Sequence, residues 1–206
     1  QESLVQLQKA MDNGVDFITQ GNGSSVASAL IAGIEKHNRR NPGDERLFLN
    51  YAAVDPVFTN ERCSFWHFRF DANSDMKMNA LTDYLAGQKE IKKVYLINRD
   101  YSHGRSVSAQ ARKMLKEKRP DIEVVGNDFH PLAKVKDFTP YISKIQASGA
   151  DAVITGNWGQ DMTLLVKAAA DFGLDAPFFT YYGASSGVAT QLGEKGVDRL
   201  YQINEY

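Results

Sequence analysis

The sequence predicts an α/β protein built on parallel β-sheets. Short apolar runs, such as 94–97 and 152–155, alternate with longer segments in which apolar residues recur at helical spacing. Breaks rich in Gly, Pro, Asn and Asp separate the two kinds of segment. Such alternation specifies right-handed βαβ units on a parallel sheet. With 206 residues, the chain can form one or two domains that each bury a core.

Charge and composition limit the partners of the chain. Lys and Arg total 24 and Asp and Glu total 25, so charge gives no reason to expect binding to nucleic acid or an anionic membrane. The apolar runs are too short to span a bilayer, which predicts no direct membrane insertion. A single cysteine, Cys63, excludes an intrachain disulfide. No signal peptide is visible, so a leader for export would lie outside this chain.

Two helices and three strands are expected before residue 71. In chain order these are a helix through Leu4, Leu7 and Met11 that ends at Asn13-Gly14, a strand at 15–19, a helix from Val26, a polar loop at 37–44, a strand at 47–51 and an extended aromatic segment at 65–70. The helix after the first strand follows a turn of small residues, Gly21-Asn22-Gly23-Ser24-Ser25.

From residue 71 onward the alternation is regular. The polar break 71–75 opens a helix whose apolar side is Met76, Leu81, Tyr84 and Leu85. Thr139 is expected to cap a later helix, with Pro140 at its first position. The expected strands are 94–97, 122–125, 152–155, 177–182 and 200–203, and the remaining helices are 107–118, a segment closed by Gly149, 162–172 ended by Gly173, and a short one through Leu192.

Hydroxyl and aromatic side chains gather where the predicted strands end. In open parallel sheets, ligands bind outside the carboxyl ends of the strands. These ends carry few ionisable groups, which is typical of a binding site more than of an acid–base catalyst. The residues concerned are Ser24, Ser25, Tyr101, Ser102, Trp158, Tyr182, Ser185 and Ser186.

The turn 21–25 is the first candidate for a ligand contact. It lies between the end of a strand and the start of a helix, where free backbone N–H groups and the helix dipole attract an anion. Ser24 and Ser25 add hydroxyl donors, and the glycines allow a ligand to approach the backbone. The alternative interpretation is that Ser24 or Ser25 only caps the helix.

The order of several short motifs resembles one family of proteins. These motifs are Gly14-Val15-Asp16-Phe17-Ile18, Ser24-Ser25, Ala53-x-Asp55-Pro56, Phe68-Arg69, Asp100-Tyr101-Ser102-x-Gly104, Lys136-Asp137-Phe138-Thr139-Pro140, Gly149-Ala150-Asp151-Ala152-Val153 and Ala170-x-x-Gly173-Leu174. In this order they are similar to the branched-chain amino-acid-type solute-binding proteins of ABC transporters, across nearly the whole chain. Each motif alone is weak, and their order and spacing carry the resemblance.

The resemblance implies a type I periplasmic-binding fold, in which two Rossmann-like lobes are joined by hinge crossovers. Residues 1–70 would form part of the first lobe and 71–206 the second, with hinge strands near 65–70 and 201–206. Members are usually about twice as long, so the chain is expected to be an internal fragment. The implied protein is periplasmic, uses no cofactor, catalyses no reaction, and traps a small carboxylate-bearing solute for delivery to a membrane permease.

The resemblance also implies roles for particular residues. Ser24 and Ser25 match the residues that hold the ligand carboxylate, and Ala53 and Val54 match a second loop of the first lobe. Tyr101 and Trp158 match aromatic residues of the second lobe that close over the ligand, and Tyr182 adds a further aromatic wall. Ser185 stands where amino-acid binders carry the acidic partner of the ligand ammonium.

Two departures from the family pattern bear on the ligand. Ser185 brings no charge, and Val54 replaces a residue that usually bears a hydroxyl. A buried ammonium without a carboxylate is costly, so we expect an aromatic or aliphatic carboxylic acid without an α-amine. An amino acid stays open as the alternative, since an acidic residue elsewhere, or the aromatic walls themselves, could hold the ammonium.

The sequence also contains partial matches to motifs of other functions. Gly183-Ala184-Ser185-Ser186-Gly187 matches the nucleophile elbow of a serine hydrolase, but no His follows residue 130 to complete a triad. Gly21-x-Gly23 resembles a dinucleotide fingerprint in which Val26 replaces the third Gly. The histidines, at positions 37, 67, 103 and 130, show no metal-ligand spacing. A sensor domain with the same fold, part of a receptor or regulator, stays open.

Overall fold

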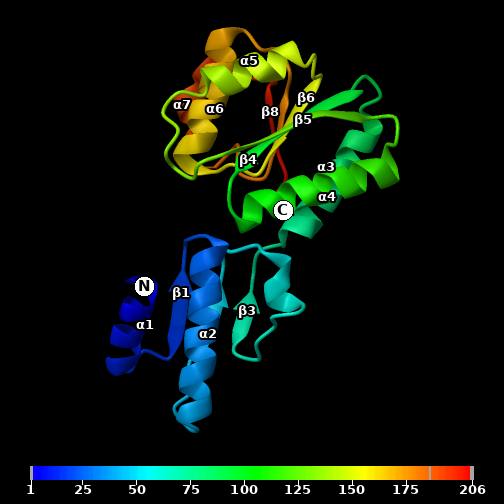
Figure 1. The fold of residues 1–206 in the computed structure, drawn as a ribbon. Coiled ribbons are helices and arrows are strands. Elements are labelled where there is room, and N and C mark those ends of the chain that lie inside the picture. Colours follow the sequence, from blue (N-terminus) through cyan, green and yellow to red (C-terminus); the bar gives the residue numbers. More distant parts are fainter. Residues whose placement is uncertain (1, 186, 205–206) are drawn as a thin grey trace. The chain divides into compact units, whose positions relative to one another are not determined.

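A computed structural model describes residues 2–185 and 187–204. The chain divides into two compact units, Gln1–Ser74 and Asp75–Tyr206. Each unit has its own parallel sheet, of three and five strands respectively (Figure 1). The α/β class with parallel strands is therefore confirmed, and every strand pair in both sheets is parallel.

The first unit contains a sheet with strand order β1-β2-β3. Its core packs α2 against the sheet through Ile18, Ile34 and Phe48, and α1 adds Leu7 and Met11. In chain order its elements are α1 (Glu2–Asp12), β1 (Phe17–Gln20), α2 (Ser24–Arg40), β2 (Leu47–Asn50), the 3-10 turn η1 (Pro56–Thr59) and β3 (His67–Arg69).

Helix α2 extends to Arg40 and so includes the first residues of the predicted loop 37–44. Buried Asn38 explains the extension. Its side chain donates to the Arg46 carbonyl at 2.9 Å and accepts from the Arg46 amide at 2.8 Å. These two bonds tie the last turn of the helix to the residue before β2, so a polar residue becomes a tertiary contact.

The second unit is a five-stranded sheet with order β5-β4-β6-β7-β8, covered by helices on both faces (Figure 1). In chain order its elements are α3 (Ser74–Gly87), β4 (Lys93–Arg99), α4 (Ser102–Lys118), β5 (Glu123–His130), α5 (Thr139–Ala147), β6 (Ala152–Thr155), α6 (Gly159–Phe172), β7 (Phe178–Thr180), α7 (Val188–Leu192), the 3-10 turn η2 (Gly193–Gly196) and β8 (Leu200–Gln202).

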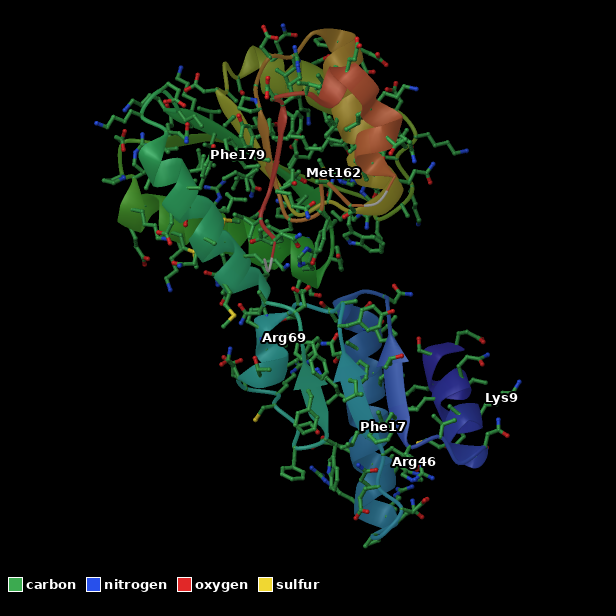
Figure 2. All side chains as sticks on the ribbon, turned by 180° about the vertical axis from the view of Figure 1, so that it is seen from behind. Lys9, Phe17, Arg46, Arg69, Met162 and Phe179 are labelled. Carbon is green, nitrogen blue, oxygen red and sulfur yellow. The ribbon has the colours of Figure 1, made fainter. Side chains whose placement is uncertain are left out.

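Alternate side chains of the sheet feed two separate cores. On β4, Val94 and Leu96 pack with α3 and α4, whereas Tyr95 and Ile97 pack with α5 and α6, as the two-residue period of a strand requires. Met162 of α6 and Phe179 of β7 lie in opposite cores and are labelled in Figure 2. Strand β4 lies between β5 and β6. The chain therefore passes from β4 to β5 on one side of β4 and then crosses to β6 on its other side.

Three local predictions were wrong. Helix α4 begins at Ser102, directly after its N-cap Tyr101 and five residues before the expected 107. Met76 on α3 is 60 % exposed and Met78, which is fully buried, takes its place in the core. Helix α5 is not capped by Thr139. Its N-cap is Phe138, and Asp137 accepts from the Thr139 amide at 2.9 Å.

Candidate functional site

The helix start after β1 leaves amide groups available. Gly23 is the N-cap of α2 and no side chain caps the helix, so the interpretation of Ser24 or Ser25 as a cap is wrong. Ser24 is buried and Ser25 is exposed. Among the described residues, the Ser24 and Ser25 amides have no hydrogen-bond acceptor. They are two of the donors that a helix N-terminus leaves unsatisfied, and they suit an anion.

The loop after β2 is held by one side chain. Asn50 accepts from the Ala53 amide and donates to the Ala53 carbonyl, each at 2.8 Å. Ala53 and Val54 are both at most 3 % exposed, and Ala53 belongs to the core of the first unit. Their side chains therefore face the protein interior, and a ligand contact from either remains a prediction.

Tyr51 joins this loop to the turn after β1. A Cβ placed on Gly21 would lie 2.5 Å from the Tyr51 hydroxyl, so a larger residue there would displace this ring. Tyr51 is 57 % exposed. Sequence reasoning assigned it to a strand and missed this position at the carboxyl edge of the sheet, beside the turn that contains Ser24.

In the second unit, Tyr101 and Trp158 meet at the point where the strand order reverses. Tyr101 follows β4 and Trp158 follows β6, which is its neighbour in the sheet. The indole Nε1–H of Trp158 donates to the Tyr101 hydroxyl at 3.0 Å. Crevices at such reversal points are where open α/β sheets bind ligands. The two residues are the N-caps of helices α4 and α6, and both are partly exposed.

A buried ion pair that the sequence analysis did not anticipate supports these aromatic residues. Arg99 and Asp161 are 3 % and 2 % exposed, and Arg99 Nε donates to Asp161 Oδ2 at 2.6 Å. Arg99 Nη2 donates to the Trp158 carbonyl at 2.6 Å, and the guanidinium lies 4.1 Å from the centre of the Trp158 ring. The Asp161 carboxylate also accepts from the Ala133 amide at 3.0 Å. Arg99 is the last residue of β4, and Asp161 lies in the first turn of α6, so both are at the carboxyl edge of the sheet.

Burial raises the pKa of the Tyr101 hydroxyl, whereas its bond from Trp158 and the nearby charge of Arg99 oppose that rise. The phenol therefore remains neutral at physiological pH. It accepts from Trp158 and keeps its own proton for a ligand oxygen.

His103 lies in the first turn of α4, with its ring beside that of Tyr101. It is 3 % exposed, its Nε2 lies 3.3 Å from the Gly156 carbonyl, and its Nδ1 is buried with no hydrogen-bond partner in the structure. Tyr101, Tyr181 and Tyr182 surround its ring, with centroids 5.8, 6.0 and 6.2 Å away. The pKa of His103 is lowered to about 4, mainly by burial and also by the charges of Arg99 and Lys77, while the Gly156 bond opposes the change.

This pKa predicts how stability depends on pH. The unfolded histidine binds a proton below pH 6.5, whereas the folded one stays neutral down to about pH 4. The free energy of unfolding should therefore fall as the pH drops from 6.5 towards 4, and His103 should account for about 2 kcal/mol between pH 7 and pH 5. Urea unfolding of the native protein and of His103→Gln at both pH values measures this. An equal pH dependence in the two proteins would contradict the assignment.

Tyr182 lies beside this cluster, with Lys77 Nζ 5.6 Å from the centre of its ring. Ser185 is partly buried in the turn after β7, where its amide donates to the Tyr182 carbonyl at 3.3 Å. Ser186 lies outside the described residues. Among the residues that are described, no hydrogen bond joins Ser185 to a histidine, so nothing in the structure adds to the serine-hydrolase alternative.

Features outside this edge are as follows. Within residues 2–185 and 187–204, no three His, Cys, Asp or Glu side chains gather as metal ligands. None of the helices there has both the length and the apolar composition to cross a membrane. Cys63 is exposed.

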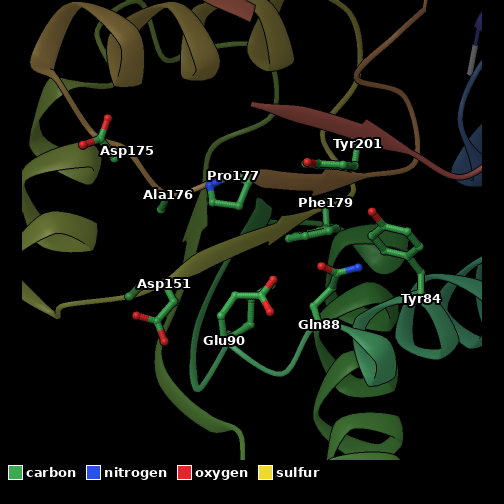
Figure 3. A pocket seen from close by; sticks show the side chains of 11 residues that line it. Tyr84, Gln88, Glu90, Asp151, Asp175, Ala176, Pro177, Phe179 and Tyr201 are labelled. Atoms are coloured by element: carbon green, nitrogen blue, oxygen red, sulfur yellow. The ribbon is translucent and has the colours of Figure 1, made fainter. Parts of the chain in front are cut away.

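Two hollows lie beside the sheets, and one of them reaches Gly21 and Asn22 of the turn after β1. A groove of about 710 Å³ follows β1 in the first unit, between α1 and α2, and includes the 61 % exposed Phe17 (Figure 2). A pocket of about 410 Å³ lies in the second unit, at the amino ends of β6 and β7 (Figure 3). Its aromatic lining is Tyr84, Phe179 and Tyr201, and none of the predicted site residues lines either hollow.

Comparison with known proteins gives consistent results. All of residues 1–206 match the family described as periplasmic binding protein. A Leu/Ile/Val-binding protein homolog 4 from Brucella abortus is 36% identical over 177 residues, which are 85% of this chain and 42% of that protein. The chain thus spans less than half the length of this relative.

Two solved structures are also similar. The leucine-, isoleucine-, valine-, threonine- and alanine-binding protein from Brucella ovis, in its closed conformation, is 35% identical with a TM-score of 0.83, over 94% of this chain and 49% of that one. A solute-binding protein of an ABC transporter from R. palustris, in complex with 4-hydroxybenzoate, is 22% identical with a TM-score of 0.76, over 87% and 46% of the two chains. The second likeness concerns the fold alone.

Proposed function

The chain belongs to the periplasmic binding protein family, the solute-binding proteins of ABC transporters, and from that premise we propose that it binds a small carboxylate-bearing solute for an importer. In this proposal the units Gln1–Ser74 and Asp75–Tyr206 belong to the two lobes of the type I periplasmic-binding fold. Hinge strands near 65–70 and 201–206 let the lobes close on the solute. The closed protein, outside the cytoplasm, delivers it unchanged to a permease.

The observation that carries this proposal is the Tyr101–Trp158 pair at the reversal point of the sheet. The two rings are joined by a 3.0 Å hydrogen bond and are fixed from behind by Arg99. Such a wall binds a flat or apolar body. In the other unit, the free amides of Ser24 and Ser25 suit the carboxylate. These two rings and two amides offer contacts to a ligand, and no two of these groups are arranged as a nucleophile and its base.

The ligand in this proposal is an aromatic or aliphatic carboxylic acid without an α-amine. Tyr182 and Ser185 bring no carboxylate to the edge, and Asp161 is occupied by Arg99 and the Ala133 amide. The relatives named for leucine, isoleucine and valine favour the alternative, an amino acid. Matched ligands that differ only in the amine distinguish the two.

Calorimetry on the whole chain tests the proposal. The probes are 4-methylpentanoate against leucine, and 3-phenylpropanoate against phenylalanine. We expect each acid to bind more tightly than its amino analogue. An amino acid that binds at least about tenfold more tightly, a difference of about 1.4 kcal/mol, would overturn the ligand class. Mass spectrometry after long incubation should recover the acid unchanged, and turnover would show an enzyme.

A matched pair of variants locates the site. Ser24→Ala removes a hydroxyl next to the free amides, and we expect it to weaken binding of the acid about tenfold, as the loss of a charge-assisted hydrogen bond would. Ser143→Ala is the control, since that hydroxyl donates only to the Thr139 carbonyl within α5. Equal affinities of the two variants would remove Ser24 from the site.

A further inference from the structure

We propose that Arg99 determines which ligands this site accepts, because its guanidinium occupies one face of Trp158 and makes the opposite face unfavourable for an ammonium group. The inference deepens the proposed function and rests on it. Neither the motifs that identify the family nor the residues predicted from the sequence include Arg99.

The guanidinium is fixed over the ring by three contacts. It lies 4.1 Å from the ring centre of Trp158, donates from Nη2 to the carbonyl of the same residue at 2.6 Å, and donates from Nε to Asp161 at 2.6 Å. Arg99 is 3 % exposed, and its hydrogen bonds to Asp161 and to the Trp158 carbonyl hold the guanidinium at this ring. The accessible part of the indole is therefore the face and edge that Arg99 leaves uncovered.

Asp161 balances this charge only in part. Its Oδ2 lies on the Nε side of the guanidinium and also accepts from the Ala133 amide at 3.0 Å. Among the described residues, Asp161 is the carboxylate that pairs with Arg99, and the guanidinium Nη1 is buried with no hydrogen-bond partner. The positive charge is consequently exposed towards the indole, and the negative charge is held away from it.

A second aromatic ring of the edge also carries a cation of the protein. Lys77 Nζ lies 5.6 Å from the ring centre of Tyr182, and Lys77 is buried. Lys77 and Arg99 thus each place a cation near one aromatic ring. Burial raises the pKa of the Tyr181 hydroxyl, and the Asp75 carboxylate lies close enough to contribute to that rise. His103, whose ring lies beside those of Tyr101 and Tyr182, remains neutral at physiological pH and adds no charge of its own.

These positions decide between the two ligand classes. A free aromatic face strengthens the binding of a cation by about 2- to 30-fold. A second cation on the opposite face of Trp158 would lie about 8 Å from the guanidinium, where repulsion in a protein site is of similar size. For an ammonium ligand, this repulsion cancels the gain in affinity from the aromatic face. The ring or apolar body of a carboxylic acid keeps its contact with the indole.

The test compares ligand preference in three proteins. The double variant Arg99→Gln/Asp161→Asn removes the cation together with its partner, so that no charge is left buried alone. The matched control is Arg105→Gln/Asp100→Asn, because Arg105 also pairs with an aspartate and lies 5.1 Å from the ring centre of Phe129. The measured quantity is the ratio of the dissociation constants of leucine and 4-methylpentanoate.

We expect the double variant to lower this ratio by about fivefold, in favour of leucine, and the control to leave it unchanged. Arg99→Lys keeps a cation and should retain the ratio of the unaltered protein. An unchanged ratio in the double variant would overturn the inference while leaving the proposed function intact. Failure of the unaltered protein to bind either ligand would instead remove the proposed function.

A measurement without ligand tests the electrostatic basis directly. Trp66 and Trp158 are the two tryptophans, so Trp66→Phe leaves Trp158 as the single fluorophore. Relative to free N-acetyltryptophanamide, Trp158 should show a higher ratio of iodide quenching to caesium quenching, because anions concentrate beside Arg99. Adding Arg99→Gln/Asp161→Asn should lower the iodide-to-caesium ratio by about twofold. A ratio in the Trp66→Phe protein no higher than that of free N-acetyltryptophanamide would overturn the inference even if the double variant does not fold.

Discussion

Replacement of Asp161 by alanine should lower the free energy of unfolding of the second unit by about 3–5 kcal/mol. The change leaves the Arg99 guanidinium, which is 3 % exposed, without its carboxylate, and it also removes the acceptor of the Ala133 amide. An uncompensated buried charge costs far more than the pair contributes when it is intact. Urea unfolding in the Trp66→Phe background measures this loss, because Trp158 then reports on the second unit alone.

The control is the double variant Arg99→Gln/Asp161→Asn. It should be more stable than Asp161→Ala, although it removes more charge, because neutral amides leave no unpaired ion. If Asp161→Ala and the double variant lose equal stability, the loss comes from packing at this position, and the penalty for an isolated charge does not apply.

Replacement of Gly104 by alanine is the second change with a large expected effect. A Cβ at Gly104 would lie 2.0 Å from the carbonyl oxygen of Arg99, which is backbone and cannot rotate away. The first turn of α4 would have to move off β4, taking Tyr101, its N-cap, out of line with Trp158. We expect a loss of about 3 kcal/mol of stability, at the upper end of overpacking costs.

Gly87→Ala is the matched control for Gly104→Ala. Gly87 is the last residue of α3, and a Cβ there would meet nothing within 4 Å. Its expected effect stays within about 1 kcal/mol in either direction. Comparable losses from the two substitutions would show that the close approach of Gly104 to Arg99 is not a constraint on the fold.

Much of the fold could be predicted from the sequence because the strands are short and apolar. Runs such as 94–97 and 152–155 gave β4 and β6, and Gly173, with φ of 79°, ends α6 as expected. The start of α4 was missed for a physical reason. Ser102 and His103 are polar residues that suggest a loop, but His103 is buried among aromatic rings at the start of the helix.

The candidate site was predictable only in part. Position at the carboxyl end of a strand placed Tyr101 and Trp158 on the same edge, and the structure joins them. Arg99 and Asp161 were missed because they are 62 residues apart and charged residues are usually solvated. One signal was available. Arg99 is the last residue of β4 and Asp161 lies in the first turn of the helix after the neighbouring strand, so both fall at the reversal point.

The groove beside β1 has a consequence for solubility. Among the described residues β1 pairs only with β2, so its other edge presents unbonded backbone groups next to the exposed ring of Phe17. Proteins usually protect such edges with lysine, proline or a bulge, and Phe17-Ile18-Thr19-Gln20 contains neither lysine nor proline. A bare edge of this kind is a template for strand addition by another molecule. The tendency of the purified chain to self-associate therefore depends on what covers β1. Binding measurements should be made at low protein concentration.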